Sequence, residues 1–141
     1  MLASRTAALV ALLLLPACVG VRVPEPADLS GRWRMVSAER DGQDLTAQAN
    51  PDGDRTIALW PDGSFIATGG GTDGDNRGRW HYVPNTQRIV LDSDLGPDAD
   101  SDWTVTMVGR DRMRWDGEVG GASLVIVSVR AGDVRPRGPR R

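Results

Sequence analysis

The chain has 141 residues, enough for one folded domain and hardly for two. Its 17 basic residues, all arginine, and 19 acidic residues give a formal net charge of -2, but five of the arginines lie in the last twelve residues. The rest of the chain is therefore acidic, which argues against a nucleic-acid-binding face. The 17 glycines and 9 prolines indicate many turns and few long helices.

Residues 1–17 have the features of a bacterial lipoprotein signal peptide. Arg5 precedes the apolar run Ala7–Leu15, which is too short to cross a bilayer as a mature helix. The run leads into Leu15-Pro16-Ala17-Cys18, which resembles the lipobox. The resemblance implies cleavage before Cys18 and acylation of its sulfur and its new amine, and two or more acyl chains anchor a protein stably. The alternative is an ordinary secretory signal with an incidental cysteine.

Residues 18–29 are expected to form a lipidated cysteine followed by a linker. Pro24-Glu25-Pro26 favours an extended chain that would hold the domain up to roughly 30 Å from the bilayer. Val19 follows the cysteine where sorting signals for the inner membrane have aspartate. The resemblance to lipoproteins therefore implies a bacterial cell envelope location, at the outer membrane and facing the periplasm.

Residues 30–130 read as one all-β domain. Alternation of apolar and polar residues, clear in Trp103–Val108, is typical of half-buried strands. Eight strands are expected, over Gly31–Ala38, Arg55–Trp60, Ser64–Thr68, Gly78–Val83, Arg88–Asp92, Asp102–Val108, Arg112–Asp116 and Ala122–Val129. Most connections are short, which makes successive strands antiparallel neighbours. Closure into an up-and-down barrel would remove the exposed edges.

Three short motifs give a family resemblance. Leu29–Ser37 with its Ser-Gly-Arg-Trp, Thr56–Phe65 with its Asp-Gly turn, and Gly78–Tyr82 with a second Gly-Arg-Trp resemble strands of bacterial lipocalin-like domains of the calycin group. The resemblance implies a calyx for a small apolar molecule. It also implies that Trp33 plugs the barrel floor and that Arg130 covers its ring.

The aromatic residues are candidates either for a ligand pocket or for the core. In one interpretation a hydrophobic ligand is bound by aromatic side chains; in the other, large rings fill a solid barrel that contains little Phe. The residues concerned are Trp33, Trp60, Trp80, Tyr82, Trp103 and Trp115.

We expect no enzyme, no cofactor and no metal site. His81 is the single histidine, and no nucleophile motif accompanies it. Asp92–Asp102 contains five aspartates, but it lacks the glycine and the glutamate of an EF-hand loop and is interpreted as a solvated turn. If Cys18 is lipidated, the mature chain has neither a thiol nor a disulfide.

Residues 131–141 are expected to be a basic, disordered tail. Two functions remain open. One is a membrane-tethered module, anchored by acyl chains on Cys18, that binds a small hydrophobic ligand. The other is a solid barrel whose surface contacts or inhibits another envelope protein.

Overall fold

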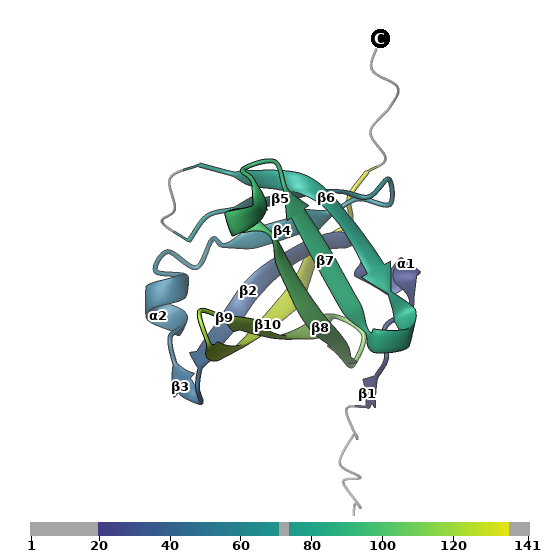
Figure 1. The fold of residues 1–141 in the computed structure, drawn as a ribbon. Coiled ribbons are helices and arrows are strands. Elements are labelled where there is room, and N and C mark those ends of the chain that lie inside the picture. The colour runs from purple at the N-terminus through teal and green to yellow at the C-terminus, as the bar shows by residue number, and fades with distance from the viewer. Residues whose placement is uncertain (1–19, 71–73, 136–141) are drawn as a thin grey trace, which may run out of the picture.

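Eight strands form a closed, antiparallel, up-and-down barrel in a computed structural model that describes residues 20–70 and 74–135 (Figure 1). Each strand pairs with the next, and the last pairs with the first, which closes the ring. The expected all-β barrel is thus confirmed. The strands are β2 (Gly31–Arg40), β4 (Thr56–Leu59), β5 (Ser64–Thr68), β6 (Asn76–Val83), β7 (Arg88–Ser93), β8 (Ser101–Val108), β9 (Arg112–Val119) and β10 (Ala122–Gly132).

Short elements connect and flank these strands. They are β1 (Val21–Arg22), α1 (Pro26–Leu29), β3 (Gln43–Asp44), α2 (Thr46–Ala49) and the 3-10 turns Pro84–Thr86 and Pro97–Ala99. Within residues 20–70 and 74–135, no helix has the length and apolar character needed to cross a bilayer. The expected signal peptide, Cys18 and residues 136–141 of the tail lie outside the described residues.

Several strands run further than the apolar pattern predicted. β2 continues to Arg40, β9 continues to Val119, and β10 reaches Gly132, two residues past the expected end of the domain. The extra residues are mostly exposed, but they still pair with a neighbouring strand. Val119, for example, lies opposite Ala122, directly beside the Gly120-Gly121 turn. A ladder of backbone hydrogen bonds can extend beyond the buried part of a strand, so apolar alternation underestimates strand length.

The segment expected to be an extended linker is instead packed on the barrel. β1 pairs with the end of β8, where Val21 lies opposite Val108. The Tyr82 hydroxyl of β6 donates to the Pro24 carbonyl, and Arg130 of β10 donates to the Asp28 carbonyl. Since β6 and β10 are on opposite sides of the eight-strand ring, this segment crosses one end of the barrel. The linker prediction failed because proline content does not report the tertiary contacts available to a segment.

The segment that crosses the barrel makes that end the closed end. Leu29 is fully buried, and the Trp33 indole Nε1–H donates to its carbonyl oxygen at 2.9 Å. Successive strands run in opposite directions, so every second connection lies at the same end of the barrel. The short turns at residues 61–63, 84–86 and 109–111 are therefore at the closed end. The longer connections, at residues 41–55, 69–75 and 94–100, meet at the opposite, open end.

The core fills the closed half of the barrel. Its fully buried members come from most of the ring: Leu29, Trp33, Leu59, Phe65, Ile89, Val105, Met107 and Met113. Successive inward residues on each strand, such as Val105 and Met107, are two positions apart, as the pleat of a strand requires. The open half is packed differently, and it contains the candidate site.

Candidate ligand-binding cavity

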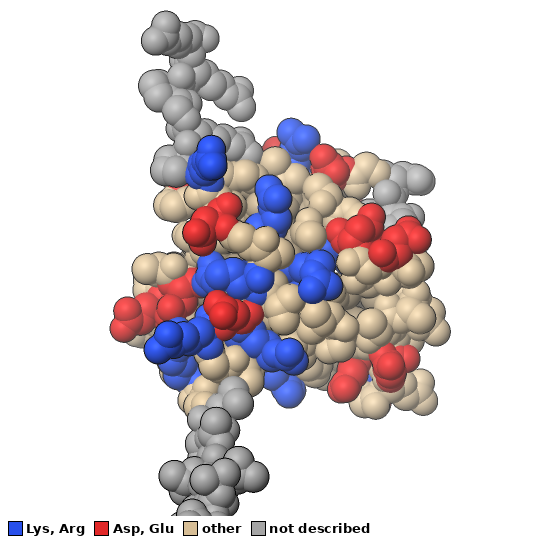
Figure 2. Space-filling view, turned by 180° about the vertical axis from the view of Figure 1, so that it is seen from behind, with Lys and Arg blue, Asp and Glu red and all other residues tan. Residues whose placement is uncertain are grey.

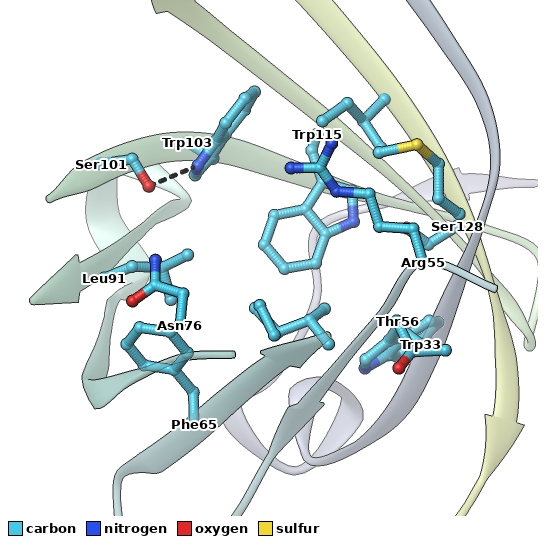
Figure 3. Close-up of a pocket in the computed structure, with 14 residues that line it drawn as sticks. Trp33, Arg55, Thr56, Phe65, Asn76, Leu91, Ser101, Trp103, Trp115 and Ser128 are labelled. Carbon is cyan, nitrogen blue, oxygen red and sulfur yellow. Dashed lines mark hydrogen bonds between the residues drawn. The ribbon is translucent and has the colours of Figure 1, made fainter. Parts of the chain in front are cut away.

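A cavity of about 150 Å³ occupies the open half of the barrel interior (Figure 3). Its base is formed by Trp33 and Phe65 from the core, and its aromatic wall by Trp103 and Trp115. Polar side chains line it as well: Arg55, Thr56, Asn76, Ser101 and Ser128. The barrel is therefore plugged at one end and hollow at the other.

The aromatic wall consists of two indoles from adjacent strands. Trp103 of β8 and Trp115 of β9 meet edge to face, with ring centroids 6.5 Å apart and planes at 85°. Gly117 of β9 makes room for this arrangement, because a Cβ atom there would lie 2.6 Å from the Trp103 ring. Two tryptophans on neighbouring strands can thus share the interior of a small barrel.

The indole N–H groups do not all have partners. Trp33 donates to the Leu29 carbonyl, Trp80 donates to the Trp60 carbonyl, and Trp103 donates to the Ser101 hydroxyl at 3.0 Å. The Trp115 Nε1–H is buried, lines the cavity and has no hydrogen-bond partner among the described residues. A buried donor without a partner costs about 1–3 kcal/mol. Figure 3 shows this nitrogen on the Ser128 side of the ring.

Among the described residues that line the cavity, Arg55 is the only charged one. The loop before β4 fixes its backbone, since its N–H donates to the Asn50 side chain at 3.0 Å. Its guanidinium donates to the Ala49 carbonyl, and it forms no ion pair with a carboxylate in the described part of the chain. In Figure 3 the side chain extends toward Trp115. A cation at the mouth is thus available to a ligand.

The six aromatic candidates separate into three groups. Trp33, Trp103 and Trp115 line the cavity. Trp80 and Tyr82 pack against the core from β6, away from the cavity. Trp60 lies at the end of β4 and lines a depression on the outer surface instead. Of the two alternatives for these residues, Trp80 and Tyr82 take the core one, and Trp60 lines neither the cavity nor the buried core.

Arg130 lies over the Trp33 ring, with its guanidinium carbon 4.4 Å from the ring centroid. It also donates to the Ser30 and Asp28 carbonyls, so it ties the end of β10 to the segment that crosses the closed end. The arrangement expected from the family resemblance is present. Arg130 belongs to the plugged end and does not line the cavity, whereas the Trp33 ring that it covers forms part of the cavity base.

The polar residues of the lining have no distinctive signal in the sequence. Arg55, Asn76, Ser101 and Ser128 begin or interrupt strands, where polar residues are usual and attract no attention. Alternation contained a signal for Arg55, because it has the same parity as the half-buried Ile57 and the buried Leu59. The cation was overlooked because Arg55 is the first residue of the predicted strand Arg55–Trp60, where a polar side chain is usual.

The other titratable candidates lie apart from the cavity. His81 is exposed on the outer side of β6. Asp100 accepts a hydrogen bond from the Ser93 backbone at 2.7 Å, so part of the aspartate-rich segment serves to shape a turn. Burial raises the pKa of Tyr82 at the closed end. No group of three or more potential metal ligands occurs in the residues that the structure describes.

The outer surface has a basic face. Arg34 of β2 and Arg112 of β9 both pair in register with Val129 of β10, so these exposed arginines flank one strand. Figure 2 shows blue side chains gathered on this side of the molecule, with acidic side chains among and around them. Near this face, Arg32 and Trp60 line the surface depression of about 390 Å³.

Comparison with models of known protein families, with curated proteins and with solved structures finds no match to this chain. The barrel is compatible with a lipocalin-like fold in its strand number and order. What the chain does must therefore be argued from the cavity and the surface.

Proposed function

We propose that the protein is a lipid-anchored, non-enzymatic lipoprotein of the bacterial envelope whose lipocalin-like barrel binds a small, largely apolar ligand at its open end. The cavity carries this proposal. It has an aromatic wall, a few polar groups and one open side, which is the usual composition of a small-molecule site. A barrel of eight strands has room for one small ligand at most.

The positions of the proposed anchor and of the cavity are consistent with one orientation of the barrel relative to the bilayer. β1 begins three residues after Cys18, so the chain between them spans at most about 10 Å. β1 lies at the closed end of the barrel, beside the end of β8. Acyl chains on Cys18 would therefore hold the closed end against the bilayer, and the cavity would open toward the aqueous compartment.

Two measurements test the proposal. Small aromatic and aliphatic probes should change the tryptophan fluorescence of the full-length protein in a saturable way, because Trp103 and Trp115 line the cavity. Cys18→Ser should give an unprocessed protein that is not retained at the membrane. Absence of any saturable response across the probe set would contradict ligand binding, and normal membrane retention of the variant would contradict the anchor.

The second candidate function is a protein-interaction or inhibitor module of the envelope. The basic outer face and the depression beside it favour this alternative, because Trp and Arg are enriched at protein interfaces. Charge reversal at Arg34 and Arg112 would then abolish crosslinking to an envelope partner. Under the ligand-binding proposal, the same change would leave the fluorescence response of the cavity unaltered.

A further inference from the structure

We infer that the ligand is a single-ring-sized aromatic carboxylate, rather than a long-chain fatty acid or a neutral apolar molecule. This inference rests on the proposed ligand-binding function and specifies its chemistry. Three features of the cavity support it: its volume, the unpartnered Trp115 N–H, and the guanidinium of Arg55.

The volume limits the apolar part of the ligand to one ring. Apolar cavities of about 150 Å³ bind benzene. A long acyl chain occupies several times that volume, and the core residues Trp33 and Phe65 close the space below. Most of such a chain would remain in water. The Trp103 and Trp115 rings offer an aromatic ligand faces and edges to pack against.

The Trp115 N–H requires an acceptor that the described protein atoms do not supply. The indoles of Trp33, Trp80 and Trp103 each donate to a protein oxygen, whereas the Trp115 N–H has no partner within the described part of the chain. Buried polar groups in folded proteins are almost always hydrogen-bonded. A ligand oxygen inside the cavity would satisfy this donor, and a purely hydrocarbon ligand would not.

Arg55 determines the charge of the ligand. It is the only charged residue of the lining in residues 20–70 and 74–135, and its guanidinium has a planar set of donors that suits a carboxylate. Asp94 and Asp98 at the same end of the barrel oppose an anion. They are exposed on the connection between β7 and β8 and do not line the cavity, so salt screens them over about 8 Å.

Three probes test the inference: benzoate, benzyl alcohol and palmitate. Their binding is measured with the full-length gene product in the processed form that the host cell makes. Tryptophan fluorescence gives the affinities, and the ¹⁵N–¹H spectrum follows the indole N–H of Trp115, assigned with Trp115→Phe. We expect benzoate to bind about tenfold more tightly than benzyl alcohol, because a charge-assisted hydrogen bond is stronger than a neutral one. Benzoate should also shift the Trp115 N–H resonance.

Arg55→Gln provides the matched variant, and Arg112→Gln on the outer face provides the control. We expect Arg55→Gln to remove the preference for benzoate while benzyl alcohol still binds, and Arg112→Gln to change neither affinity. The comparison of probes on the unmodified protein remains decisive if Arg55→Gln fails to fold.

The outcomes separate the two proposals. Equal binding of benzoate and benzyl alcohol, or tighter binding of palmitate, would overturn the carboxylate inference and leave the ligand-binding function in place. A benzoate preference that survives in Arg55→Gln would overturn the role of Arg55 in the inference. Failure of all three probes to bind would overturn both proposals and favour the interaction module.

Discussion

Gly31 is required by the packing of another residue. Its φ of +146° lies in a region that L side chains rarely adopt, and a Cβ atom at this position would overlap the Arg130 guanidinium. The Ser-Gly-Arg-Trp motif therefore encodes a close approach between the start of β2 and the end of β10. Glycine allows Arg130 to lie over Trp33 and to reach the Ser30 carbonyl at 2.9 Å.

Gly31→Ala should lower the free energy of unfolding by about 2–3 kcal/mol, because it combines backbone strain with displacement of Arg130. Chemical denaturation monitored by tryptophan fluorescence measures this effect. Gly20→Ala is the control, since nothing lies within 4 Å of a Cβ atom at Gly20. Equal stability of the two variants would show that the Arg130 contact is dispensable.

Trp33→Ala should destabilise the barrel by about 3–5 kcal/mol, because the ring is fully buried among core residues. Trp33→Phe keeps a ring but removes the donor to the Leu29 carbonyl. The loss of this hydrogen bond should lower the free energy of unfolding by about 1 kcal/mol. Thermal unfolding would order the three proteins. An almost unchanged Trp33→Ala variant would contradict the plugged floor.

The aromatic residues differ in how far the sequence predicts their places in the barrel. The aromatic positions and the Arg130–Trp33 pair were expected from the family resemblance. Trp60 was a candidate for the pocket or the core, although it shares its parity with Ala58, which faces away from the inward Ile57 and Leu59. The count of tryptophans suggested a pocket, but parity along the strand decides which face of the barrel each one occupies.

At the scale of elements, the segment from β1 to α1 depends on an ion pair. Arg22 of β1 donates to Asp28 of α1, and this hydrogen bond is the main cause that holds the pKa of Asp28 below its usual value of 3.8. The Asp28 carboxylate also accepts from the Glu25 backbone at 2.8 Å. The charged form of Asp28 therefore stabilises the segment that crosses the closed end.

The pH dependence follows from this direction. A carboxyl group with a lowered folded-state pKa contributes its full stability above 3.8, and the contribution is lost as pH falls through the lower folded value. Asp28→Asn should therefore be less stable than the unmodified protein at pH 7, and the difference should shrink as the pH falls below 3.8 and Asp28 becomes protonated in the folded protein. Hydrogen exchange of residues 20–29 at several pH values measures it.

Arg34→Gln is the matched control for that experiment, because Arg34 is exposed on the barrel wall away from this segment. It should leave the exchange of residues 20–29 unchanged. A constant difference between Asp28→Asn and the unmodified protein from pH 7 to pH 2 would exclude titration of Asp28 as the cause.

At the scale of the whole molecule, β10 completes the ring because it pairs with both β9 and β2. Ending the chain after Gly132 removes residues 133–141 and keeps all of these pairs, so the melting temperature should change by no more than about 2 °C. Ending it after Ile126 removes half of β10 and exposes two strand edges, which should abolish cooperative unfolding. A large drop in the first truncation would show that the tail stabilises the domain.

The sequence by itself determined the class of fold, because alternating residues and short turns leave few choices other than antiparallel neighbours. It also determined the order of the strands around the barrel. These features depend on local periodicity and on short connections, which a single sequence displays.

Only the tertiary structure decided how the interior is divided. Contacts between segments distant in the chain decide three features. Residues 20–29 pack across one end of the barrel, the other half of the interior contains a cavity, and Arg55 lines that cavity together with Trp115. The volume of a cavity is the interior volume of the barrel minus the volume of the side chains that fill it. Side chains from all eight strands contribute, so the residues of any one strand do not reveal this difference.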